Sequence, residues 1–251
     1  MKSTALITGA TSGIGAAIAR RFAQAGLRLI LCGRRAERLQ ALHQELSLHT
    51  QVQTLTFDVR SAEEVFAAVE SLPANFEKVD ILINNAGNAH GRATIDQGHL
   101  DDWDAMIDGN IKGLLYVTKA VVPRMVAAQQ GHIINIGSIA GVQVYPEGNV
   151  YCATKSAVAA LSEAMRLDLN AHHIKVSEIK PGLVETEFSL VRFKGDQEQA
   201  QRVYQGYQAL HPEDVAELAY FMVSCPAHVN IADVLILPSA QASATRVRRN
   251  P

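Results

Sequence analysis

The sequence predicts an α/β fold in which a doubly wound, seven-stranded parallel sheet carries helices on both faces within a single domain. Short apolar runs alternate along the chain with longer stretches of helical periodicity, which is the order of a β-α repeat. Several runs, such as Ile133-Ile134, are apolar at consecutive positions, as strands covered on both faces require. The length of 251 residues also suits one α/β domain.

The alternation gives the expected position of each element. Strands are expected at 5–8, 28–32, 52–56, 81–84, 132–136, 175–179 and 234–237. Helices are expected at 13–25, 36–48, 62–72, 101–128, 150–169 and 213–224. Crossover helices between sequential strands make the strands parallel, so the domain is expected to be of Rossmann type.

The interval 182–212, between the last two expected strands, contains no clear strand of its own. A connection of this length inside a compact domain is often a functional lid. The alternative is a surface excursion with two short helices. We predict a single domain over residues 1–251 with a substrate loop inserted at 182–212.

Composition favours a soluble protein that binds small molecules. The chain is 48% hydrophobic and 19% charged, and its net charge of -2 gives no reason to expect nucleic acid or an anionic membrane as partner. No run approaches the ~18–20 apolar residues of a membrane helix, and the N-terminus lacks the apolar segment of a signal peptide. Cys32, Cys152 and Cys225 are scattered, which fits a reducing, cytoplasmic setting. Neither the cysteines nor the dispersed histidines have metal-ligand spacing, so no metal is expected.

A glycine-rich turn joins the first expected strand to the first helix. The segment Thr8-Gly9-Ala10-Thr11-Ser12-Gly13-Ile14-Gly15 has the strand before it and the helix after it that a dinucleotide-binding motif needs. Glycines permit close approach of a ligand, and the free N–H groups at the helix start face an anion. A merely structural glycine turn is the alternative.

The end of the second strand indicates which dinucleotide is bound. Gly33 stands where an acidic residue would accept hydrogen bonds from the adenosine 2′-hydroxyl, and Arg34 and Arg35 follow it. Guanidinium groups are suited to a 2′-phosphate, so NADP is favoured over NAD. Alternatively, the two arginines only begin the solvated face of the next helix.

Two further segments follow strands at the same edge of the sheet. Asp58-Val59 comes after the third strand, where the chain would pass the adenine, and Asn84-Asn85-Ala86-Gly87 closes the fourth strand. Open α/β sheets bind ligands at the carboxyl ends of their strands, and small residues there let the backbone approach a cofactor. Each segment is equally compatible with a simple loop.

The reacting groups are predicted from Ser138, Tyr151 and Lys155. Ser138 follows the fifth strand, and Tyr151 and Lys155 are one helical turn apart on one face of the next helix. A cation ~4–6 Å from a phenol lowers its pKa by roughly 1–3 units, so we expect Lys155 to make Tyr151 a usable acid and base. Ser138 is expected to donate a hydrogen bond to the same substrate oxygen. The alternative is a chance pair of a half-buried tyrosine and a solvated lysine.

With these residues in place, the chain resembles the short-chain dehydrogenase/reductase family. The resemblance rests on TGxxxGIG at 8–15, NNAG at 84–87, YxxxK at 151–155, Asn110, Ser138, and Pro181-Gly182 with Thr186. It implies a catalytic tetrad of Asn110, Ser138, Tyr151 and Lys155, in which the asparagine serves a proton relay through a bound water. Together with the motifs above, it gives the expected cofactor contacts Gly9, Thr11, Ser12, Gly13, Ile14, Gly15, Arg34, Arg35, Asp58, Val59, Asn85, Ala86, Gly87, Tyr151, Lys155, Pro181, Gly182, Val184 and Thr186.

A narrower resemblance covers nearly the whole chain. Segments such as "GHIINIGSIAG", "GNVYCATKSAV" and "PGLVETEFSLVRFKGD" are similar to the NADP-dependent 3-hydroxy acid dehydrogenases, the branch that includes serine and allo-threonine dehydrogenases and malonic semialdehyde reductases. This implies hydride transfer at the 3-hydroxyl of a small 3-hydroxy acid, such as serine, allo-threonine or 3-hydroxypropionate, and a homotetramer. A carboxylated substrate needs a cation, and Arg192 in the 182–212 loop is the first candidate and Lys194 the second; the alternative is a solvated or structural arginine. Ser138 and Tyr151 are the other expected substrate contacts.

Two other functions stay open on the sequence alone. One is an NADPH-dependent reductase of uncharged ketones, diketones or quinones. The other is a non-catalytic protein that senses NADPH, although such proteins usually lack the tyrosine or the lysine, and both Tyr151 and Lys155 are present.

Overall fold

The computed structural model describes residues 3–250, so the first two residues and the last one of the predicted 1–251 domain lie outside the described residues. Its sheet has seven strands in the order β3-β2-β1-β4-β5-β6-β7, and every neighbouring pair is parallel. The predicted doubly wound sheet is confirmed. The strands are β1 (Thr4–Thr8), β2 (Arg28–Gly33), β3 (Val52–Thr56), β4 (Ile81–Asn84), β5 (Gly131–Ile136), β6 (Ile174–Pro181) and β7 (Asp233–Ile236).

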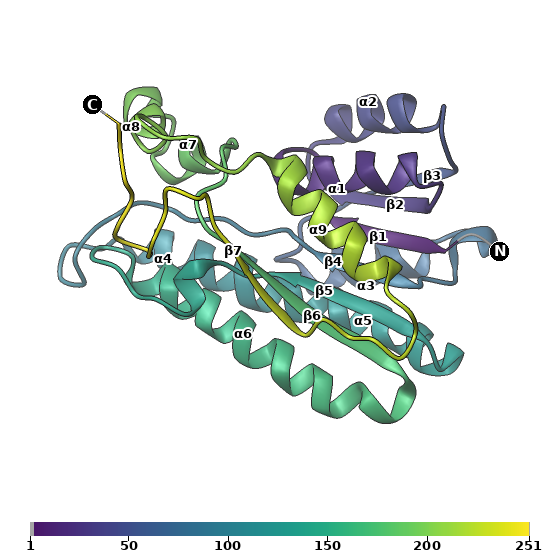
Figure 1. Cartoon of the computed structure of the whole chain (residues 1–251). Coiled ribbons are helices and arrows are strands. Elements are labelled where there is room, and N and C mark those ends of the chain that lie inside the picture. The colour runs from purple at the N-terminus through teal and green to yellow at the C-terminus, as the bar shows by residue number, and fades with distance from the viewer. Residues whose placement is uncertain (1–2, 251) are drawn as a thin grey trace.

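Helices cover both faces of the sheet, as Figure 1 shows. One face packs against α1 (Gly13–Gln24), α2 (Ala36–Leu46) and α9 (Pro212–Ser224). The other packs against α3 (Ala62–Glu70), α5 (Gly113–Ala128) and α6 (Asn149–Leu169). Single turns η1 (Ala74–Phe76), η3 (Ile139–Gly141) and η4 (Asn170–His172) complete the connections.

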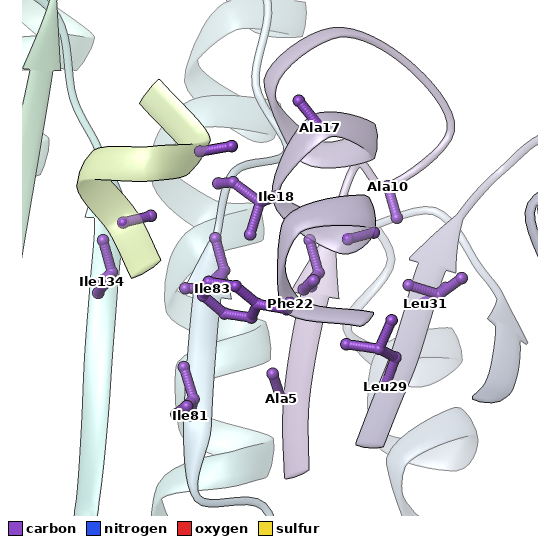
Figure 2. Packing of buried hydrophobic residues seen from close by; sticks show 14 of the residues in the cluster. Ala5, Ala10, Ala17, Ile18, Phe22, Leu29, Leu31, Ile81, Ile83 and Ile134 are labelled. Atoms are coloured by element: carbon purple, nitrogen blue, oxygen red, sulfur yellow. The ribbon is translucent and has the colours of Figure 1, made fainter. Parts of the chain in front are cut away.

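The centre of the first face is a dry apolar cluster around Phe22. The side chains of Ile18 and Phe22 come from α1 and pack on strand residues such as Ile83, and all three are fully buried. Figure 2 shows these side chains between the helix and the strands. Close packing here fixes the position of α1, and with it the glycine-rich turn at its start.

The predicted single helix over 101–128 is wrong in one respect. The segment begins as α4 (Leu100–Ile107), widens into the π-helical turn η2 (Asp108–Lys112), and continues as α5. The side chain of Asn110 turns inward and binds the backbone of Asn88 on both sides, at 2.8 Å each. Such π turns insert a residue into a helix and occur frequently at functional sites. Helical periodicity alone does not reveal the inserted residue.

The interval 182–212 carries two short helices, α7 (Phe188–Arg192) and α8 (Gln197–Arg202). They lie together beyond one end of the sheet, above the end of β6 from which the segment departs (Figure 1). Among residues 3–250, no helix is both long and apolar enough to span a bilayer. The sheet order reverses at β1, which has β2 on one side and β4 on the other, and a crevice for ligands is expected at that point.

Candidate active site

A large open cleft of about 1120 Å³ lies at the carboxyl ends of the strands. Its walls come from the glycine-rich turn, the loops after β2 to β5, the start of α6 and the 182–212 segment. Of the sequence-predicted cofactor and substrate residues, all line this cleft except Gly15 and Asn110. Gly15 packs behind the turn, where an added Cβ would lie 2.4 Å from the Gly9 carbonyl oxygen.

The glycine-rich turn takes its tight path only because Gly9 and Gly13 have no side chains. Gly9 has φ of +64°, and a Cβ there would lie 2.8 Å from the amide nitrogen of Asn85. Gly13 has φ of +51° and lies against the Thr186 methyl group. Both glycines are therefore required by conformation and by close contact. The Ser12 side chain does not cap the start of α1, and Gly13 and Ile14 line the cleft there.

The arginines after β2 are held in two different ways. Arg34 forms an ion pair with Asp58 at 3.6 Å, and Asp58 also pairs with Arg60 at 2.6 Å. Arg35 instead turns toward the glycine-rich turn and donates to the hydroxyls of Thr11 and Ser12 at 2.9 and 2.8 Å. The alternative in which both arginines begin a solvated helix face does not describe Arg35.

Ser138, Tyr151 and Lys155 line the same part of the cleft. The Ser138 hydroxyl accepts from the Ala140 N–H at 3.1 Å, which fixes it at the start of η3. Lys155 is 7% exposed, and its Nζ donates to the Ile136 carbonyl at the end of β5, at 2.9 Å. Tyr151 is 8% exposed and packs against Phe188 with ring centroids 5.7 Å apart.

The expected lowering of the Tyr151 pKa by Lys155 is not found. Burial raises the pKa of the Tyr151 phenol above its ordinary value, and the groups that oppose this rise are Ser138 and Arg192. Burial also lowers the pKa of Lys155 to about 8, against the effect of the Glu178 carboxylate, which raises it. Desolvation is the largest cause of both shifts. Tyr151 is therefore a neutral phenol here.

Asn110 lies behind this centre rather than in it. Its Nδ2 donates to the Asn88 carbonyl at 2.8 Å and to the Thr154 hydroxyl at 3.0 Å, and its Oδ1 accepts from the Asn88 N–H. A Cβ on Gly87 would lie 2.8 Å from Asn110 Oδ1 and 3.6 Å from Lys155 Nζ. Asn110 thus connects the loop after β4 to the helix turn that carries Lys155.

Arg192 approaches the centre from the 182–212 segment. Its guanidinium carbon lies 5.1 Å from the Tyr151 ring, 5.5 Å from Tyr145 and 5.9 Å from Phe188, and it donates to the Tyr145 hydroxyl. Its Nε is buried and has no protein partner among the residues described. The main-chain carbonyl of Arg192 accepts from the Gly91 N–H at 2.9 Å, which ties the segment to the opposite wall.

Several residues at the site were not predicted from the sequence. Tyr145 and Phe188 form an aromatic surround for Tyr151 and Arg192, and no motif identifies them. Glu178 is 1% exposed, and its Oε1 would lie 2.0 Å from a Cβ on Gly137. Glutamate side chains are rarely fully buried, so a glutamate in a buried strand is unusual. Its position in such a strand is the one signal in the sequence that could have identified Glu178.

Within the described part of the chain, no group of histidine, cysteine or acidic side chains could hold a metal ion. Cys32 and Cys152 are buried free thiols, and Cys225 is partly exposed and also free.

A switch-point crevice with a glycine-rich turn at a helix start is the arrangement of Rossmann-type oxidoreductases that use a dinucleotide. The sequence pattern described as short chain dehydrogenase matches residues 3–197. The chain belongs to this family, as its motifs predicted, and it is an oxidoreductase.

Two characterised relatives are similar over almost their whole length. The NADP-dependent 3-hydroxy acid dehydrogenase YdfG of Escherichia coli strain K12 is 48% identical over 240 residues, which are 95% of this chain and 96% of the relative. Sulfoacetaldehyde reductase 2 of Chromohalobacter salexigens is 45% identical over 243 residues, 96% of each chain.

Solved structures agree with this assignment. The closed form of serine dehydrogenase complexed with NADP+ superposes with a TM-score of 0.92 at 47% identity, covering 98% of this chain and 100% of the other. Serine dehydrogenase from Escherichia coli has a TM-score of 0.83 at 42% identity, covering 95% of this chain and 99% of the other. The predicted single-domain Rossmann-type architecture is confirmed.

Proposed function

We propose that this chain is an NADP-dependent dehydrogenase that oxidises the 3-hydroxyl group of small 3-hydroxy acids and reduces the corresponding carbonyl in reverse. The observation that carries the proposal is the convergence of Ser138, Tyr151, Lys155 and Arg192 on one cleft beside the glycine-rich turn. The names of its relatives, NADP-dependent 3-hydroxy acid dehydrogenase and serine dehydrogenase, support the same reaction.

The cleft fits a phosphorylated dinucleotide. The backbone at Gly9 lines the cleft, and the Arg35 guanidinium stands beside the Thr11 and Ser12 hydroxyls, where a phosphate would find several donors. The adenosine and ribose would be bordered by Asp58, Val59 and the Asn85–Gly87 turn. The nicotinamide end would be bordered by Pro181, Gly182, Val184 and Thr186. When bound, NADP supplies the acceptor for the hydride that leaves the substrate carbon.

The residues of the chain manage the proton and the substrate oxygen. Tyr151 exchanges the hydroxyl proton with the substrate, which is general acid–base catalysis. Ser138 donates a hydrogen bond to the same oxygen, and Lys155 binds the nicotinamide ribose. A cationic nicotinamide ring would favour the phenolate, against the effect of burial on Tyr151. Asn110 positions the helix turn behind Lys155, and the expected water relay at this residue stays a prediction.

Recognition of the substrate carboxylate is assigned to Arg192, and the 182–212 segment is assigned as the substrate loop. The Arg192 guanidinium faces Tyr151 and keeps an unpartnered buried Nε, so it has a donor to offer an anion. Substitution of Arg192 by Ala should raise KM for 3-hydroxy acids far more than KM for an uncharged alcohol. Equal effects on both substrates would favour the reductase of uncharged carbonyls instead.

The proposal is tested with Tyr151→Phe, using Tyr220→Phe as the matched control because Tyr220 lies on α9, outside the cleft. Loss of general acid–base catalysis lowers the rate by about 10²–10⁴-fold, and NADPH binding should persist. The substrates are serine, allo-threonine and 3-hydroxypropionate with NADP. Full activity of Tyr151→Phe would refute the assigned chemistry. NADPH binding without turnover of any carbonyl by the unaltered protein would indicate a sensor.

We also propose that the protein is cytoplasmic and assembles as a homotetramer. Support for assembly comes from large apolar side chains left exposed on α4, α5 and α6, namely Leu100, Leu115 and Leu167, which are 69%, 38% and 74% exposed. Exposed apolar groups of this kind often mark interfaces. Light scattering on the full chain measures the assembly directly, and a monomer would contradict it.

A further inference from the structure

Glu187, the residue just before α7, lies between two arginines from the other side of the cleft. Its carboxylate accepts from Arg35 Nη1 at 3.1 Å and from Arg38 Nη1 at 2.8 Å. The same Arg35 guanidinium donates to Thr11 and Ser12 of the glycine-rich turn. The Glu187 carboxylate, which belongs to the 182–212 segment, therefore occupies one edge of the Arg35 guanidinium. The same guanidinium faces the glycine-rich turn.

The ion pairs of Glu187 with Arg35 and Arg38 are charged, and another anion can take the place of the carboxylate. The guanidinium of Arg38, with that of Arg35, holds the pKa of Glu187 below its ordinary value, so the carboxylate is ionised at neutral pH. The side chains of Glu187, Arg35 and Arg38 are 44%, 42% and 48% exposed. Ion pairs this exposed are weak and screened by solvent, so another anion can replace one of the partners.

A 2′-phosphate would draw on the same donor. Both arginines that follow β2 line the cleft, but Arg34 is paired with Asp58, whereas Arg35 lies beside two hydroxyls of the glycine-rich turn. Guanidinium groups bind carboxylate and phosphate with the same planar fork geometry. Occupation of Arg35 by Glu187 and occupation by a phosphate are therefore in competition.

We propose that Glu187 is a specificity-determining residue whose carboxylate competes with the adenosine 2′-phosphate for Arg35, and so restrains the preference of the enzyme for NADP(H) over NAD(H). Arg38 holds Glu187 in place for this competition. The inference rests on the proposed use of NADP. Binding of the phosphorylated cofactor releases Glu187 from Arg35, while the ion pair between Glu187 and Arg38 remains.

The test measures the Kd of NADPH and of NADH for the full chain by cofactor fluorescence. Glu187→Gln removes the competing charge, and Glu187→Lys reverses it. Glu185→Gln is the matched control, because Glu185 is exposed two residues away and makes no ion pair or side-chain hydrogen bond in residues 3–250. The conservative variant Glu187→Asp keeps the charge.

We expect Glu187→Gln to bind NADPH about 2- to 5-fold more tightly, the range given by losing one exposed ion-pair competitor. The affinity of Glu187→Gln for NADH should stay constant. Glu187→Lys should bind NADPH more tightly than Glu187→Gln does. The affinities of Glu185→Gln and Glu187→Asp for NADPH should resemble that of the unaltered protein. The gain in NADPH affinity should shrink as the salt concentration is raised, because salt screens the interaction of Arg35 with Glu187 and its interaction with the 2′-phosphate.

Other results separate the two proposals. Unchanged NADPH affinity in Glu187→Gln and Glu187→Lys, or equal changes for NADPH and NADH, would overturn the inference while the unaltered protein still binds NADPH. Failure of the unaltered protein to bind NADPH would instead overturn the proposed cofactor.

Discussion

Replacing Lys155 by Met should abolish turnover and yet make the protein more stable near neutral pH. Burial lowers the pKa of Lys155 from 10.5 to about 8, and the gap between these values corresponds to about 3 kcal/mol of unfavourable burial of the cation. The substitution also removes the hydrogen bond from Nζ to the Ile136 carbonyl, which costs about 1 kcal/mol. The net gain is about 2 kcal/mol.

The pH dependence gives this prediction its sign. Below the folded-state pKa of about 8 the lysine is charged in both states, so the unaltered protein bears the full burial cost there. As pH rises from about 8 to 10.5, the folded protein holds a neutral amine while the unfolded chain is still charged, and the cost fades. The advantage of Lys155→Met should therefore be largest near neutrality and should decline through this window.

Thermal unfolding measures the effect. For a chain of this size a gain of 2 kcal/mol raises Tm by about 4–8 °C. The comparison at neutral and at alkaline pH uses the same two proteins, so it controls for packing changes that do not titrate. A Tm below that of the unaltered protein at neutral pH, or a difference that is constant with pH, would refute the reasoning that burial of a cation sets the stability here.

Three further outcomes follow from packing and burial. Phe22→Ala empties a fully buried site and should cost about 3–5 kcal/mol in urea unfolding, whereas Phe66→Ala, at a site 36% exposed, should cost much less. Burial lowers the pKa of His132 to about 3, so stability should fall as pH drops from 6.5 toward this value, by about 1.4 kcal/mol per pH unit, and His132→Gln should flatten that slope. Gly137→Ala would place a methyl group 2.0 Å from a buried carboxylate oxygen and should reduce both Tm and activity, whereas Gly109→Ala, with its nearest neighbour 3.8 Å away, should be nearly neutral in Tm.

The sequence predicted the fold well because apolar runs and helical periodicity report directly on burial. The strand at residues 52–56 was predicted to the residue, and most other elements shifted by one or two positions. The interruption at Asn110 was missed, because a π turn depends on a tertiary contact with Asn88 and leaves the helical pattern almost unchanged.

The placement of the site was likewise predictable, but its electrostatics were not. The positions of Tyr151 and Lys155 follow from helical spacing and strand ends. The direction of the Tyr151 pKa shift depends on how deeply the phenol is buried, and the residues that bury it, such as Met106 and Phe188, come from distant segments of the chain. The same applies to Glu187, whose partners Arg35 and Arg38 lie about 150 positions earlier, as separations of 152 and 149 residues show.

The strand order also bears on how the chain matures during synthesis. β1 pairs with β2 on one side, but its other neighbour, β4, begins only at Ile81. A growing chain can therefore assemble β1, β2 and β3 while one edge of β1 is still open, and open strand edges are templates for pairing with other chains. Slow translation between β3 and β4 would prolong that exposure, so the yield of native protein should depend on how quickly the ribosome passes this interval.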